Sequence, residues 1–168
     1  MTFAHLHLLL NHVPVIGVVL GAVLFGAALV RRDSTLVKTT LSLFVALAVV
    51  SLVVYLTGGQ AEELVENLPG VSESIIETHE DAALVASIAM GILGTASLGA
   101  LLVFRKRALP GWLTAASFAG ALAVAGLMGW TANLGGQIRH TEIRAGAGNG
   151  GAGEAARDAE PAGRGGDR

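Results

Sequence analysis

Four long apolar blocks constrain the fold of this chain more than any other feature of its sequence. They cover residues 8–30, 39–56, 82–104 and 111–134. A helix needs about 20 apolar residues to cross the hydrocarbon core of a bilayer. Within lipid, only helices and closed barrels satisfy their own backbone groups, and these unbroken runs lack the alternating pattern of a barrel strand. The sequence therefore predicts an all-α fold, an integral membrane four-helix bundle.

The blocks also set the predicted boundaries. We expect a transmembrane domain at residues 1–144, with spans at about 8–30, 37–56, 80–104 and 111–134 and an acidic outer loop at 57–79. Residues 145–168 are rich in Gly and Ala and lack a hydrophobic face, which predicts a disordered tail. The composition agrees with a membrane protein, because only 14% of the residues are charged, against roughly 25% in a soluble domain.

The basic residues predict the orientation of the bundle. The two short connections carry six of the chain's 11 Lys and Arg residues: Arg31, Arg32, Lys38, Arg105, Lys106 and Arg107. By the positive-inside rule, both connections are cytoplasmic. We therefore expect a multi-pass protein of the bacterial inner membrane, with both termini and the long loop outside, on the periplasmic side.

The sequence has the pattern of two duplicated helical hairpins. Residues 55–63 read YLTGGQAEE and residues 130–142 read WTANLGGQIRHTE, so both place an aromatic residue, a threonine and Gly-Gly-Gln at an outer boundary. Aligning the first and third spans pairs His5 with His79, Gly17 with Gly91 and Arg31 with Arg105. Two hairpins of the same orientation would be related by a pseudo-twofold axis along the membrane normal.

The outer loop is strongly acidic. It and the residues next to it carry seven of the chain's 13 acidic residues: Glu62, Glu63, Glu66, Glu73, Glu77, Glu80 and Asp81. Residues 61–68 predict a short amphipathic helix ended by Pro69-Gly70, and Ser72 is the expected N-cap of a helix that continues into the third span. The acidic residues form either a solvated loop or a docking face for a basic partner such as a soluble cytochrome c.

All five histidines fall at the outer end of a span: His5, His7, His12, His79 and His140. An imidazole that leaves water costs free energy unless it finds a partner. His12 lies inside the first apolar run, two residues before Pro14. Because proline denies the helix a hydrogen bond, it predicts a kink or the true helix start here. On an unbroken helix, His7 and His12 would diverge by about 140°.

Haem is one cofactor that would use these histidines. A b-type haem takes two imidazoles from facing helices of a bundle. We favour His12 and His79 as the axial ligands, with His7 and His140 as alternatives or as a second pair. The chain contains no cysteine, which excludes thiolate ligands and covalent c-type haem.

Two other interpretations stay open. Copper or zinc would take three of the histidines with one carboxylate from Glu63, Glu77 or Glu142. Alternatively, the histidines only hydrogen-bond to each other and to nearby amide side chains, in a cofactor-free structural subunit of a membrane complex.

The run HLLLNHVP, residues 7–14, fits the pattern H-x4-H-x-P. In this it resembles an uncharacterised family of bacterial four-helix membrane proteins, whose usual form is HPxxVHFP. The family also carries a Gly near an acid after the second span, a His opening the third, and GG-x-L-x-x-x-H after the fourth. The corresponding residues here are Gly58 with Glu62 and Glu63, His79, and His140 in GGQIRH, one residue short of the family's spacing.

The resemblance implies a b-type haem scaffold, and relatives in that family occur joined to Rieske iron–sulfur or cytochrome c modules. The candidate ligands it implies are His7, His12, His79 and His140. We therefore expect a membrane electron-transfer subunit with haem b near the periplasmic face. Its expected partner at the acidic loop is a periplasmic cytochrome c or Rieske-type protein, and a homo- or hetero-oligomer stays open.

Other function classes find little support in the sequence. It contains no recognisable nucleophile–base pair or phosphate loop, so we expect an electron-transfer or accessory subunit rather than an enzyme. No charged residue lies near the midplane of a span, where transporters place their substrate sites. We expect no nucleic-acid partner.

Overall fold

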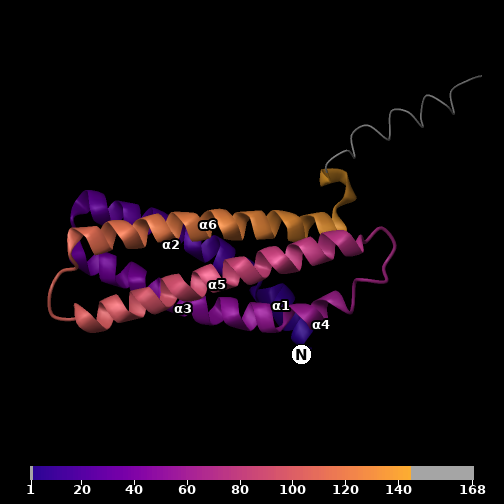
Figure 1. Cartoon of the computed structure of the whole chain (residues 1–168), viewed down its shortest axis with the longest axis horizontal. Coiled ribbons are helices and arrows are strands. Elements are labelled where there is room, and N and C mark those ends of the chain that lie inside the picture. The colour runs from indigo at the N-terminus through magenta and orange to yellow at the C-terminus, as the bar shows by residue number, and fades with distance from the viewer. Residues whose placement is uncertain (1, 145–168) are drawn as a thin grey trace, which may run out of the picture.

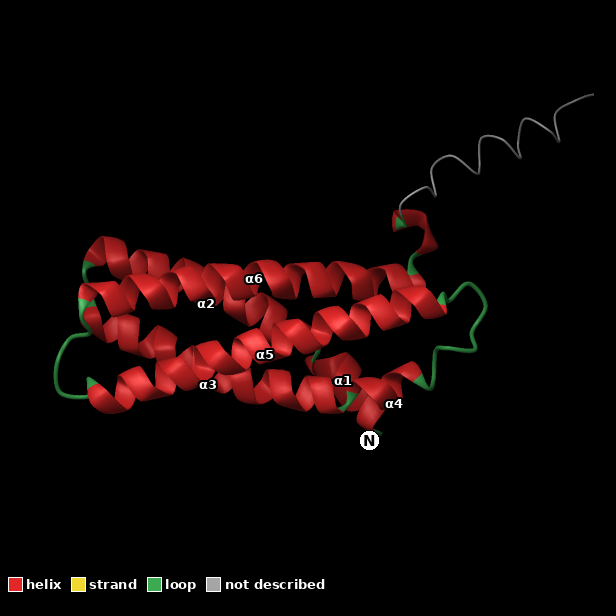
Figure 2. Ribbon diagram, in the orientation of Figure 1, coloured by secondary structure: helices red, strands yellow, loops and turns green. Residues whose placement is uncertain are grey.

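The computed structural model describes residues 2–144, so the predicted tail at 145–168 lies outside the described residues. Within residues 2–144 the fold is all-α, as predicted, with no strand (Figure 1, Figure 2). The helices are α1 (Phe3–Leu10), α2 (His12–Arg31), α3 (Ser34–Leu56), α4 (Gly58–Glu62), α5 (Glu73–Val103), α6 (Gly111–Arg139) and the short 3-10 helix η1 (Thr141–Ile143).

Four parts of the chain are long and apolar enough to cross a membrane, as expected of the predicted four-helix bundle. The first is formed by α1 and α2 together, and the others are α3, α5 and α6. The spans pack side by side in the order α2, α3, α5, α6, and α6 closes against α2. A half-turn about the bundle axis would take α2 onto α5 and α3 onto α6. This order of neighbours therefore agrees with a duplicated hairpin.

The two ends of the bundle differ in charge. The α2–α3 and α5–α6 connections lie at one end, which we call the basic end after its six Lys and Arg residues: Arg31, Arg32, Lys38, Arg105, Lys106 and Arg107. α1, α4 and the α4–α5 connection lie at the opposite, acidic end (Figure 2). The acidic end also carries η1, which follows α6 (Figure 1).

Aromatic and small side chains fill the core of the bundle. Phe25 of α2 stacks on Phe44 of α3 and on Phe118 of α6, with ring centroids 6.2 Å and 5.9 Å apart. Gly94 of α5 lies against Ala48 and the Phe44 carbonyl of α3, so these two helices approach closely. Many large apolar side chains on the outer faces of the spans stay exposed, as expected of surfaces that face lipid.

The first span is interrupted at Asn11. α1 ends at Leu10, and α2 begins at His12 with Pro14 in its first turn. Pro14 has no N–H to donate to the Leu10 carbonyl, so the ladder of helical hydrogen bonds is broken there. The predicted interruption is confirmed, and it places His7 and His12 on different helices.

The acidic loop differs in part from its prediction. α5 begins directly after Ser72 and continues into the third span, as predicted, but the Ser72 hydroxyl pairs with Ser74 and does not cap the helix. The predicted helix at 61–68 is wrong, because α4 ends at Glu62 and turns follow. Leu64 and Leu68 of the predicted apolar face are exposed, and a short helix without packing is unstable in water.

Candidate histidine site

His7 of α1 is anchored by a backbone carbonyl of α3. Its ring Nδ1 lies 3.0 Å from the carbonyl oxygen of Val54, near the end of that helix. The side chain is half-buried. The ring lies beside Gly58, where an added Cβ atom would sit 3.7 Å from Cε1 of His7. The short helix α1 therefore presents His7 to the junction of α3 and α4.

His79, near the start of α5, is anchored in the same way by α6. Its Nδ1 lies 3.0 Å from the carbonyl oxygen of Thr131, and its side chain is also half-buried. A Cβ atom on Gly135 would lie 3.0 Å from Cε1, 3.4 Å from Nδ1 and 3.6 Å from Nε2 of the ring. The imidazole fills the space that a side chain at position 135 would need.

The two anchors occupy equivalent positions in the sequence. Val54 precedes the glycine pair Gly58-Gly59 by four residues, and Thr131 precedes Gly135-Gly136 by four. In each case the carbonyl four residues before the Gly-Gly pair accepts the hydrogen bond from Nδ1, and the first glycine of the pair lies beside the ring. The two hairpins are therefore alike in the way each holds one histidine ring.

The contacts also correct the predicted alignment of the two hairpins. The counterpart of His79 is His7, not His5, because His7 and His79 make the equivalent hydrogen bonds. The first span is interrupted at Asn11 whereas α5 is continuous. A linear alignment without a gap therefore pairs the wrong histidine.

These hydrogen bonds set the tautomer of both rings. A carbonyl oxygen only accepts hydrogen bonds, so Nδ1 of His7 and of His79 carries the proton and donates it. In a neutral imidazole, Nε2 then keeps its lone pair. Metal-ligating histidines show this pattern, because a carbonyl at the other nitrogen fixes the ring and raises the basicity of the ligand.

The other predicted ligands have a different setting. His12 is the first residue of α2, and its side chain is exposed. His140 follows α6 and is 64% exposed, and its Nδ1 donates to Glu142 Oε1 at 2.8 Å. Among the four predicted ligands, only His7 and His79 share a half-buried ring anchored on a backbone carbonyl.

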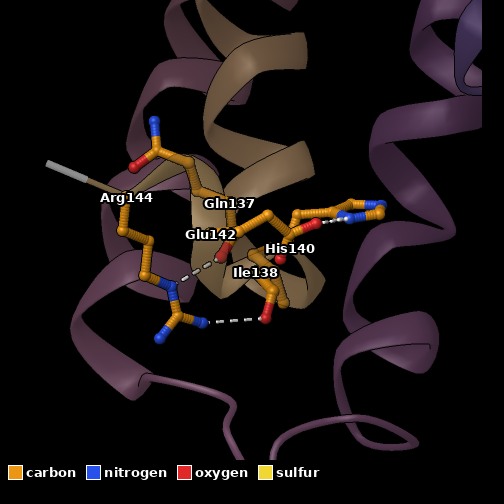
Figure 3. A network of polar contacts seen from close by, with 5 residues as sticks. All are labelled: Gln137, Ile138, His140, Glu142 and Arg144. Carbon is orange, nitrogen blue, oxygen red and sulfur yellow. Dashed lines mark hydrogen bonds and ion pairs between the residues drawn. The ribbon is translucent and has the colours of Figure 1, made fainter. Parts of the chain in front are cut away.

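Arg144 holds the segment that follows α6 (Figure 3). Its guanidinium donates to the carbonyls of Gln137 at 2.8 Å and Ile138 at 3.1 Å, and to the Gly70 carbonyl at 2.8 Å. Arg144 therefore caps α6 and ties it to the α4–α5 connection. Next to it, the backbone N–H of Glu142 and the His140 ring hold the pKa of the Glu142 carboxyl below its usual value of 4.5.

In the described part of the chain, carboxylates do not join the histidines in a metal cluster. Within residues 2–144, no group of three or more His, Asp and Glu side chains is placed to hold a metal ion. The predicted copper or zinc arrangement of three histidines with Glu63, Glu77 or Glu142 is therefore not assembled. The neighbouring Glu80 side chain raises the pKa of the Glu62 carboxyl above its usual value of 4.5, and burial of Glu62 and the charge of Glu80 add to this effect.

Sequence reasoning found the two anchored histidines among its candidates but not their carbonyl partners. The repeated Gly-Gly-Gln motif was the only sequence signal for those partners. Comparison of the chain with protein-family models, curated proteins and solved structures gives no match.

Proposed function

We propose that this protein is a membrane electron-transfer subunit that binds a b-type haem through His7 and His79. The observation that supports this is the pair of half-buried rings, each with Nδ1 bonded to a backbone carbonyl and Nε2 left as a Lewis base. A bis-histidine b-type haem needs two such nitrogens, from different helices of a bundle. α1 and α5 supply one each.

The surroundings of the two rings suit this cofactor. Gly58 and Gly135 carry no side chain, so the two rings can lie close to the helix backbone at these positions. Asn11 lies one helical turn beyond His7, and the backbone N–H of Asn11 donates to the His7 carbonyl. The Asn11 Oδ1 atom is buried and has no donor within residues 2–144. Because buried acceptors are rarely left without a partner, Oδ1 is available to a polar group of a bound molecule.

The chain's own residues have a positioning role in this proposal. A bound b-type haem supplies one-electron chemistry at its iron. Val54 and Thr131 hold the two imidazoles in one tautomer and one orientation through their carbonyls. His12 and His140 lie outside the proposed ligand pair, which therefore differs from the pair of His12 and His79 that the sequence favoured.

The acidic end is the proposed meeting place with an electron carrier. By the positive-inside rule the basic end faces the cytoplasm, which puts the haem on the periplasmic side of a bacterial inner membrane. A basic partner, such as a cytochrome c or Rieske-type protein, would gain encounter rate from the acidic side chains. Its electron-transfer rate with this protein should therefore fall steeply as the ionic strength rises.

The test of this function is the cofactor content of the full chain, purified in detergent after expression with ample haem supply. We expect haem b in a fixed ratio to protein, a b-type reduced-minus-oxidised spectrum, and no stoichiometric copper or zinc in elemental analysis. A folded protein with a featureless spectrum would overturn the proposal. Stoichiometric copper or zinc without haem would overturn it in favour of a metal-binding function.

A further inference from the structure

The basic end presents a second chemically distinct surface, remote from the histidines. Lys38 Nζ donates to the Arg105 carbonyl at 3.2 Å, so the start of α3 and the α5–α6 connection lie side by side. This contact gathers the cations of both short connections. Lys38 is half-buried, and the other five side chains are exposed: Arg31, Arg32, Arg105, Lys106 and Arg107.

The positive charge at this end is not neutralised within residues 2–144. None of the six side chains forms an ion pair in this part of the chain. The acidic residue nearest to them in sequence, Asp33, uses Oδ1 to accept the N–H groups of Thr35 and Leu36 as the N-cap of α3. Arg107 lies over the Phe104 ring, 5.5 Å from its centroid. Six cations are therefore left to attract an anion.

Exposed apolar side chains adjoin these cations. Val30, next to Arg31, is 86% exposed, and Trp112 in the first turn of α6 is 72% exposed. Leu102 and Val103 at the end of α5 are exposed as well. Tryptophan is enriched where the headgroups of a bilayer meet its hydrocarbon. Cations beside apolar side chains match the two parts of a phospholipid, its charged headgroup and its acyl chains.

We propose that the basic end is a binding site for an anionic phospholipid. Its headgroup phosphate would lie among Arg105, Lys106 and Arg107, and its acyl chains along the apolar faces next to Val103 and Trp112. Clusters of Lys and Arg beside membrane helices attract anionic headgroups, and each added cation strengthens the attraction. A free phosphate ion gains nothing from the apolar side chains, so the lipid is the favoured occupant.

The experiment is native mass spectrometry of the detergent-purified full chain, titrated with phosphatidylglycerol or with phosphatidylcholine of the same acyl chains. Each cation near the headgroup strengthens binding roughly five-fold, so three cations predict a preference for phosphatidylglycerol on the order of 100-fold. The triple variant Arg105→Ala, Lys106→Ala, Arg107→Ala should lose most of this preference. Arg139→Ala, which removes an exposed cation at the acidic end, should keep the preference.

A further variant separates charge from folding. Arg105→Lys with Arg107→Lys keeps both charges and should keep the preference for phosphatidylglycerol. Equal binding of the two lipids by the unaltered protein would overturn the proposal, as would an undiminished preference in the triple alanine variant. Displacement of phosphatidylglycerol by an equal concentration of inorganic phosphate would overturn it in favour of a site for free anions.

Discussion

At the scale of single residues, Gly135 and Gly58 lie beside the anchored rings of His79 and His7, at different distances. The His79 ring lies against position 135 so closely that a Cβ there would meet Cε1 at 3.0 Å. At position 58 the corresponding separation from His7 is 3.7 Å, an ordinary van der Waals contact. The two positions therefore form a matched pair for testing how the rings are held.

We predict that Gly135→Ala displaces the His79 ring and that Gly58→Ala leaves the His7 ring in place. Groups that orient a metal-ligating histidine typically change metal affinity by about 10–100-fold. Gly135→Ala should therefore weaken haem retention roughly ten-fold or more, whereas Gly58→Ala should retain haem as the unaltered protein does. Haem titration of the two apo-proteins measures this. Equal affinities would show that contact at position 135 does not position His79.

The contact between His140 and Glu142 predicts a pH-dependent effect. The pKa of Glu142 is lowered by its own backbone N–H and by the His140 ring. The ionised Glu142 carboxylate therefore stabilises the folded state above pH 4.5, and this stabilisation is lost as the pH falls through the lowered pKa. His140→Ala should raise the pKa of Glu142 partway towards 4.5. An NMR titration of the carboxyl carbons checks this, and an unchanged pKa would contradict the contact.

The residue scale is also where sequence reasoning reached its limit. The ends of the apolar blocks placed the histidines at one end of the bundle, because helix length fixes the depth of each residue. They could not show that the His7 ring is half-buried and anchored whereas the His12 side chain is exposed. The carbonyl that anchors His7 belongs to Val54, 47 residues away, and that of His79 to Thr131, 52 residues away. Only tertiary packing brings these partners together.

At the scale of helices, close packing of α3 and α5 depends on the absence of a side chain at Gly94. A Cβ there would collide with Ala48 and lie 3.2 Å from the Phe44 carbonyl oxygen, and neither can move freely. Among the described residues, no atom lies within 4 Å of a Cβ added at Gly91, one turn earlier. The same substitution should therefore act in opposite directions at the two positions.

We predict that Gly94→Ala lowers the free energy of unfolding by about 1–3 kcal/mol, the usual cost of overpacking a core. Gly91→Ala should raise it by up to about 1 kcal/mol, because alanine favours a helix over glycine. Chemical unfolding in detergent, followed by circular dichroism, measures both. A Gly94→Ala variant as stable as Gly91→Ala would mean that α3 and α5 are not in close contact here.

A helix end could be predicted where a local rule determines it. It could not be predicted where packing determines it. Pro14 marked the interruption of the first span because its missing N–H acts regardless of the surroundings. The amphipathic pattern at 61–68 predicted a helix that does not form there, and its apolar residues Leu64 and Leu68 stay exposed. A pattern of this kind indicates a helix only when a partner surface exists.

At the scale of the whole molecule, the division into a basic and an acidic end predicts the orientation in the membrane. The chain has no cysteine, so single cysteines report on one site each. Ser34→Cys at the basic end and Ser74→Cys at the acidic end are both at exposed positions. In intact cells, a membrane-impermeant maleimide should label Cys at 74 and not at 34, because the positive-inside rule predicts that the basic end faces the cytoplasm. Labelling of Cys at 34 and not at 74 would show that the protein has the opposite orientation.

The four-helix bundle itself was predictable because lipid leaves a chain few choices. Each apolar block must form a helix, and short connections make successive helices antiparallel neighbours. The order α2, α3, α5, α6 around the ring could not be read from the blocks, because the aromatic stack of Phe25, Phe44 and Phe118 and the close approach at Gly94 arise only in the packed bundle.

The pairing of His7 with His79 is tested most directly by reduced-minus-oxidised absorption spectra of the purified full chain and three variants: His7→Ala, His79→Ala and His12→Ala. We predict that the b-type α-band of the unaltered protein is lost in the first two variants and unchanged in the third. An α-band that persists in His7→Ala but disappears in His12→Ala would contradict the assignment and make His12 the ligand.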